Sequence, residues 1–131
     1  MEFRKIYMDM TTQEKTELQK YISINYKLGN HAKDRLFQKQ ITKEQVYDVL
    51  KFGHIIEFHY LDGSNRILVR GNNNELGNNV CVVIDIIKGR IVTVYKNNNA
   101  NDNHKTLNRS QYIRNLDILS LAKYNKLRTI N

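Results

Sequence analysis

Residues 80–96 read VCVVIDIIKGRIVTVYK, two runs of β-branched residues separated by Lys88-Gly89. Such residues favour strands, and a two-residue connection with glycine in the second position is typical of a type I′ turn. We therefore predict an antiparallel hairpin of two strands, over residues 80–87 and 90–96. Both runs are apolar on both faces, so the hairpin should lie centrally in a sheet that helices cover on at least one side.

Upstream of this hairpin the sequence predicts two more strands. After Gly53 the hydrophobic period changes from helical to alternating, which indicates strands over about residues 55–61 and 66–71. Between them stands Asp62-Gly63-Ser64-Asn65, a cluster of turn-forming residues. Residues 2–10 fit either a short strand or an extended arm.

Two capping boxes, each a threonine followed three residues later by Glu or Gln, predict helix starts. They are Thr11–Glu14 and Thr42–Gln45. We predict helices over residues 12–25 and 43–52 from them. Gly53 stands where a C-cap glycine ends the second of these helices.

The pattern as a whole predicts an α+β protein in which N-terminal helices pack on a four-stranded antiparallel sheet, with a C-terminal helical extension. At 131 residues the chain is expected to form a single domain, residues 1–131. The basic extension is expected over residues 104–131. An amphipathic helix there would be lined by Tyr112, Leu116, Leu119 and Leu127.

Composition and charge narrow the function classes. The net charge of +8 favours a polyanionic partner, and residues 98–131 carry six Lys/Arg against two Asp/Glu. No apolar run is long enough to cross a membrane, and the N-terminus does not resemble a signal peptide. The lone Cys81 has no disulfide partner within the chain. We expect a cytoplasmic protein that binds no membrane.

Two pairs of polar residues stand at spacings that place each pair on one face of its element. His31 and Arg35 are four residues apart in a helix expected to begin near its N-cap, Asn30. Thr93 and Tyr95 are two residues apart in the last strand. If the fold brings helix and strand together, four polar side chains converge on one cleft, which is the outline of a small nuclease site.

Four short segments carry a family resemblance: HAKDR at 31–35, ITKEQV at 41–46, GHIIE at 53–57 and IVTVY at 91–95. In this order and spacing, roughly over residues 28–96, the chain resembles a small bacterial and phage family of unknown function. That family is similar to the barnase, EndoU, colicin and RelE (BECR) superfamily of metal-independent ribonucleases and toxins. The resemblance implies a helix-plus-antiparallel-sheet fold whose cleft cuts RNA at a phosphodiester.

The residues are compatible with that chemistry, which needs a base, an acid and a positively charged side chain that stabilises the phosphorane-like transition state. It needs no metal and no cofactor. The helix dipole favours neutral His31, which suits a general base, and Arg35 can grip phosphate bidentately. Thr93 and Tyr95 can donate hydrogen bonds to phosphate or orient the histidine, and Tyr95 can stack on a base. RNA is the expected partner, together with a host protein or a cognate antitoxin or immunity protein.

Other interpretations stay open. A histidine in the first turn of a helix is often a plain surface residue, and Thr and Tyr are common in strands. The chain would then be a non-catalytic phage or mobile-element protein that binds a host protein or nucleic acid on the same scaffold, or a DNA-binding accessory module. An open, positively lined cleft favours the enzyme.

A wider set of basic residues is predicted to contact nucleic acid, with a solvated surface as an equal alternative. The set consists of Arg66, Arg70, Lys105, Arg109 and Arg114, with Lys123, Lys126 and Arg128 further along the tail. The remaining polar strand residues suggest no metal site. His54 and His59 are five residues apart and should lie on opposite faces, and Glu57, on the face of His59, should point to solvent.

Overall fold

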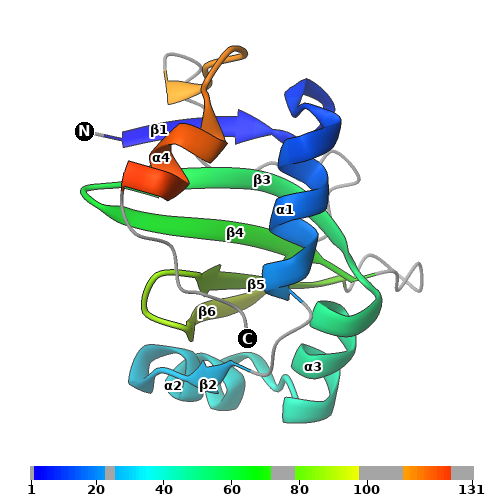
Figure 1. Ribbon diagram of the computed structural model, residues 1–131. Helices are drawn as coiled ribbons and strands as arrows, with labels where there is room; N and C mark the ends of the chain where they lie inside the picture. The colour runs from blue at the N-terminus through cyan, green and yellow to red at the C-terminus, as the bar shows by residue number, and fades with distance from the viewer. Residues whose placement is uncertain (1, 23–25, 72–78, 98–110, 125–131) are drawn as a thin grey trace.

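A computed structural model describes residues 2–22, 26–71, 79–97 and 111–124 of the chain (Figure 1). The fold is α+β, as predicted. Its elements in chain order are β1 (Glu2–Ile6), the 3-10 helix η1 (Tyr7–Asp9), α1 (Thr12–Ile22), β2 (Lys27–Leu28), α2 (Asn30–Lys39), α3 (Lys43–Phe52), β3 (His54–Leu61), β4 (Ser64–Arg70), β5 (Asn79–Asp85), β6 (Arg90–Asn97) and α4 (Ile118–Tyr124).

The sheet has six strands in the order β1-β3-β4-β5-β6-β2, so the prediction of four antiparallel strands is wrong. Neighbours from β1 to β6 are antiparallel, while β2 pairs parallel to β6. The two further strands are the edges. Residues 2–6 form the short strand that was one of the two alternatives for the N-terminal segment, and β3 pairs with it. β2 was missed, because its two residues are too few for a periodic signal.

Both predicted capping boxes are present. Thr42 and Gln45 exchange hydrogen bonds between side chain and backbone, and α3 spans the predicted residues. Thr11 and Glu14 do the same ahead of α1. The N-cap of α2 is Gly29 rather than Asn30, which is the first helical residue.

Gly53 ends α3 for a reason other than the one predicted. Its φ of −78° is extended rather than left-handed. A Cβ at this position would lie 2.4 Å from the carbonyl oxygen of Val49 and 2.5 Å from that of Arg70. Glycine is therefore needed for the close approach of α3 to the end of β4.

The β5–β6 hairpin is antiparallel, as predicted, but its turn is longer than two residues. Asp85 pairs with Arg90, and the four residues between them form the turn. The Asp85 carboxylate accepts hydrogen bonds from the backbone N–H groups of Ile87 and Lys88, 3.0 Å each. Ile86 is fully buried, and its N–H bonds the Asn65 carbonyl of β4, so core burial and an Asx-type turn replace the type I′ geometry.

The main core lies on one face of the sheet, beneath the helices. Figure 1 shows α1 and α4 in front of the sheet and α2 beside β2 at the far edge. Core side chains from the strands include Phe58, Ile67 and Ile84, and α1 contributes Leu18 and Ile22. On the opposite face, a smaller apolar cluster of Leu68, Cys81 and Val83 packs with Tyr95.

The C-terminal segment is part of this domain rather than a separate amphipathic helix. Tyr112 forms an isolated parallel bridge with Arg4 of β1, and Ile118 is fully buried. Within residues 111–124, the described part of this segment, α4 is the only α-helix, so the predicted helix from Tyr112 through Leu127 is wrong over its first residues. Leu127 lies outside the described residues. Across the described residues no helix is long and apolar enough to cross a membrane.

Candidate functional site

Helix α2 is fixed to the edge of the sheet by one apolar stripe. Its N-cap Gly29 donates a hydrogen bond to the carbonyl of Ile91 in β6, 3.0 Å. Ala32 is fully buried in the core, and Leu36 packs against it. His31 and Arg35 lie beside that stripe and remain accessible, His31 exposed and Arg35 half-buried.

Thr93 and Tyr95 lie on the sheet face opposite the main core, half-buried. A β-bulge shifts the register of β5 and β6 at this point, because Val83 pairs with Thr93 whereas Ile84 pairs with Ile91. Val92 is the extra residue, and it changes which side chains of β6 lie on each face of the sheet, as a bulge does. The bulge was not predicted from the alternating pattern.

The structure places all four predicted residues around one open pocket of about 430 Å³. The lining residues are His31, Arg35, Lys39, Thr93, Val94, Tyr95 and Lys96. Lys39 and Lys96 were not among the predicted site residues. Lys39 had a signal in the sequence, since it continues the stripe of His31 and Arg35 by one further turn.

The described residues of this pocket carry charge of one sign. Arg35, Lys39 and Lys96 line it, and none of the described residues that line it is acidic. The Nε–H of Arg35 donates a hydrogen bond of 3.4 Å to Nε2 of His31. In this hydrogen bond Nε2 of His31 is the acceptor.

A second pocket, of about 270 Å³, adjoins the first, because Thr93 lines both. Its lining residues are Glu2, Arg4, His59, Arg66, Leu68, Val83 and Thr93, from five strands of the sheet. Arg66, one of the predicted nucleic-acid contacts, is therefore on the same sheet face as Thr93. Glu2 and Arg4 were not predicted, because β1 gave no chemical signal of its own.

Two interactions fix the side chains at the β1 and β3 end of this second pocket. The Arg4 guanidinium pairs with Glu57 at 2.8 Å, and Glu57 is fully buried, so the prediction that Glu57 faces solvent is wrong. His59 Nε2 lies 2.6 Å from a carboxylate oxygen of Glu2. Burial and the Arg4 charge hold the pKa of His59 below its ordinary value, although Glu2 and Glu57 oppose them.

His54 and His59 share a face of the sheet, contrary to prediction. They pair with Arg70 and Arg66, which are four residues apart on β4, and partners across an antiparallel pair point the same way. The cause is a β-bulge between Ile55 and Glu57 that adds one residue to β3. Among the described residues no group of three or more His, Cys, Asp or Glu is placed to hold a metal ion.

The other predicted nucleic-acid contacts lie apart from these pockets. Arg70 is on the face of Arg66 but lines neither pocket. Arg114 is exposed on the C-terminal segment, 3.7 Å from Asp9. The tail residues Lys105, Arg109, Lys126 and Arg128 lie outside the described residues, and the side chain of Lys123 does too.

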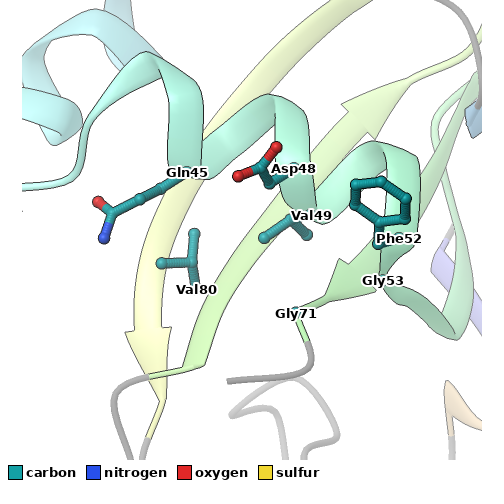
Figure 2. Close-up of a pocket in the computed structure, with 7 residues that line it drawn as sticks. All are labelled: Gln45, Asp48, Val49, Phe52, Gly53, Gly71 and Val80. Carbon is teal, nitrogen blue, oxygen red and sulfur yellow. The ribbon is translucent and has the colours of Figure 1, made fainter. Parts of the chain in front are cut away.

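A third pocket, of about 280 Å³, lies between α3 and the ends of β4 and β5 (Figure 2). Val49 and Val80 form apolar walls, and Phe52, exposed over 62% of its surface, stands at one side. Among the described residues that line it, the one charged residue, Asp48, is acidic. This pocket therefore does not suit a phosphate.

Residues 28–96 match the sequence profile of a family described as Domain of unknown function (DUF4258). The match runs from β2 to β6 and includes every residue that lines the first pocket. It leaves out β1, α1 and the C-terminal segment. No curated protein and no solved structure matches the chain.

Proposed function

The chain belongs to the DUF4258 family, whose description assigns no activity, and from its site we propose a metal-independent endoribonuclease of toxin type. The first pocket, around His31 and Arg35, would cleave an RNA phosphodiester. The similarity of this family to the BECR ribonucleases is part of the same proposal. The partners we propose are RNA and, for control of the activity, an antitoxin or immunity protein.

The observation that carries the proposal is the composition of the first pocket. Three cationic side chains and one histidine line it, and none of the described residues that line it carries a carboxylate. Positive charge concentrated in a cleft attracts phosphate and stabilises the extra negative charge of a phosphorane-like transition state. The Thr93 hydroxyl adds a hydrogen-bond donor, and Tyr95 also lines the pocket, with its hydroxyl oxygen buried.

The proposed reaction uses the RNA 2′-hydroxyl as nucleophile. His31 Nε2 takes the 2′-hydroxyl proton, and the 2′-oxygen attacks phosphorus while the bond to the 5′-oxygen breaks. Arg35, which bonds Nε2 in the free protein, transfers its hydrogen bonds to the phosphate oxygens and leaves Nε2 open to the hydroxyl. The departing 5′-oxygen takes up a proton from solvent water, His31 then releases to solvent the proton that it took from the 2′-hydroxyl, and the other product carries a 2′,3′-cyclic phosphate.

The test is incubation of the purified protein with total RNA and transfer RNA in excess chelator. The proposal expects cleavage that chelator leaves unchanged, with products ending in a 2′,3′-cyclic phosphate. Absence of cleavage of every RNA tested by clean, folded protein would reject the enzyme.

The second candidate is a non-catalytic protein that binds a host protein or nucleic acid on the same scaffold. Phe37 of α2 favours it, because 90% of this aromatic residue is exposed and aromatic residues are enriched in protein interfaces. A Phe37→Ala variant separates the two candidates. It should leave RNA cleavage unchanged if the enzyme is correct and should weaken capture of a protein partner if the alternative is correct.

A further inference from the structure

Arg66 is held in place by a short chain of hydrogen bonds. The Ser64 hydroxyl donates to the buried Asp85 carboxylate at 3.0 Å, and its oxygen accepts from Nε of Arg66 at 3.3 Å. Asp85 is itself fixed by two backbone N–H groups of the β5–β6 turn. These bonds orient the guanidinium through Nε alone.

The outer fork of Arg66 is available for a ligand. Within the described residues, no hydrogen bond or ion pair engages its Nη1 or Nη2. The side chain is half-buried and lines the second pocket. A guanidinium oriented at Nε with two free terminal nitrogens is suited to binding phosphate bidentately.

The position of Arg66 relative to the first pocket follows from the sheet register. Arg66 is on β4 and Thr93 on β6, two strands away, which is roughly 10 Å at the usual spacing of strands. Between them lie Leu68 and Val83, which are buried, with 3% and 8% of their surfaces exposed, and which line the second pocket. A single phosphate cannot contact both ends of this groove.

We propose that the pocket at Arg66 is a second phosphate subsite, and that the groove binds single-stranded RNA of several nucleotides rather than a mononucleotide or a duplex. This inference rests on the proposed function for the first pocket. One phosphate lies against Arg35 and Lys39, a later one lies against Arg66, and a base between them covers Leu68 and Val83.

Single-stranded RNA fits the groove better than a duplex does. Cations at both ends with an apolar floor between them follow the usual pattern of single-strand binding, in which charge tracks the backbone and flat surfaces take the bases. A duplex hides its bases and would leave the floor unused. Glu2, the half-buried acid of this pocket, is already paired with Arg4 and His59.

The experiment measures binding without cleavage, using 2′-O-methyl oligonucleotides, which lack the nucleophilic hydroxyl. Affinities of a dinucleotide and an octanucleotide are compared by fluorescence anisotropy for wild type, Arg66→Met and Arg90→Met. Arg90 is the matched control, since it is exposed, has the same charge and lines neither pocket. Circular dichroism checks that each variant is folded.

The loss of affinity should depend on the length of the oligonucleotide and on which arginine is substituted. Arg66→Met should weaken octanucleotide binding roughly ten-fold or more and lower the salt slope by about 0.7, with little effect on the dinucleotide. Arg90→Met should leave octanucleotide binding near the wild-type value. Equal losses in both variants would overturn the subsite, because they would reflect net charge alone.

Ser64 separates positioning from charge. Ser64→Ala removes the hydrogen bond that orients Arg66, so it should weaken octanucleotide binding. It keeps every positive charge, so the salt slope should stay near that of wild type. Ser64→Thr should restore the affinity. Wild-type affinity in Ser64→Ala would overturn the positioning role. If wild type cleaves RNA but Arg66→Met binds the octanucleotide as Arg90→Met does, the second phosphate subsite is rejected and the ribonuclease proposal stands. If nothing is cleaved but Arg66→Met loses binding selectively, the ribonuclease fails and the subsite stands.

Discussion

The guanidinium of Arg4 and the carboxylate of Glu57 form a buried ion pair 2.8 Å long, with 3% and 0% of the two side chains exposed. Tyr112 donates a further hydrogen bond to Glu57 at 2.9 Å. Glu57 lies inside the segment that matches the family, whereas Arg4 and Tyr112 lie outside it. The terminal segments are therefore built into the domain, and the pair connects them to the sheet.

Breaking this pair from one side should be costly. Glu57→Leu leaves the buried Arg4 charge with only the partly exposed Glu2 as counter-ion, and we expect a loss of about 3–5 kcal/mol in the free energy of unfolding. Urea denaturation measures it. The double variant Arg4→Met/Glu57→Leu should be more stable than Glu57→Leu alone, and a double variant at least as unstable would contradict the assignment.

Acid should destabilise the protein through Glu14. Burial acts to raise the pKa of this carboxyl, but the hydrogen bonds from Lys5 and from the Thr11 and Ile118 backbones outweigh it, so the pKa lies below its ordinary value. A depressed folded-state pKa gives stability that is present above the unfolded-state value and is lost as pH falls through the folded-state value.

Glu14→Gln should therefore flatten the acid side of the stability–pH profile, measured by thermal unfolding across pH. It should also destabilise the protein at neutral pH, since Lys5 keeps its charge in a buried site. Glu17→Gln is the control, because Glu17 pairs with Lys20 on the surface and should change stability by at most about 1 kcal/mol. Identical pH profiles for wild type and Glu14→Gln would refute the linkage.

The proposed chemistry predicts a specific set of rate losses. His31→Ala should lower the rate of RNA cleavage by about 10² to 10⁴, and Arg35→Ala should impair turnover. His31 is exposed, so His31→Ala should unfold at the wild-type urea midpoint. Full activity in His31→Ala would move the catalytic centre elsewhere, for example to the pocket around His59.

The α3–β3 junction should reject any side chain at Gly53. A Cβ there meets two backbone carbonyl oxygens at 2.4 and 2.5 Å, so Gly53→Ala should destabilise the fold by about 1–3 kcal/mol. Gly63→Ala is the comparison. Gly63 has a φ of 85° but open space around it, so its substitution costs only backbone strain, about 1 kcal/mol. A smaller loss at Gly53 than at Gly63 would argue against the close approach.

The positive charge of the C-terminal segment should strengthen RNA binding. Truncation after Asn103 is unsuitable as a test, since it removes Tyr112 and the buried Ile118. Neutralising Lys105 and Arg109 together with glutamine should instead reduce the salt slope of RNA binding by up to about 1.4, at about 0.7 per lost phosphate contact. A slope equal to that of wild type would mean that these two charges do not contact RNA.

Local sequence determined the features that depend on near neighbours. The capping box at Thr42 and Gln45 specifies where α3 begins, because its hydrogen bonds close within one turn. The spacing of His31 and Arg35 specifies that they share a helix face. These interactions form between residues a few positions apart, so the local sequence predicts them without the rest of the chain.

The tertiary structure decided everything that depends on strand register and on distant partners. Bulges in β3 and β6 changed which residues share a face, and the pairing of β1 with β3 buried Glu57. The position of α2 against β6 brought His31 and Thr93 to one pocket. Register is set by packing between segments far apart in the chain, and a shift of one residue moves a strand's side chains to the other face, so no local pattern could specify these contacts.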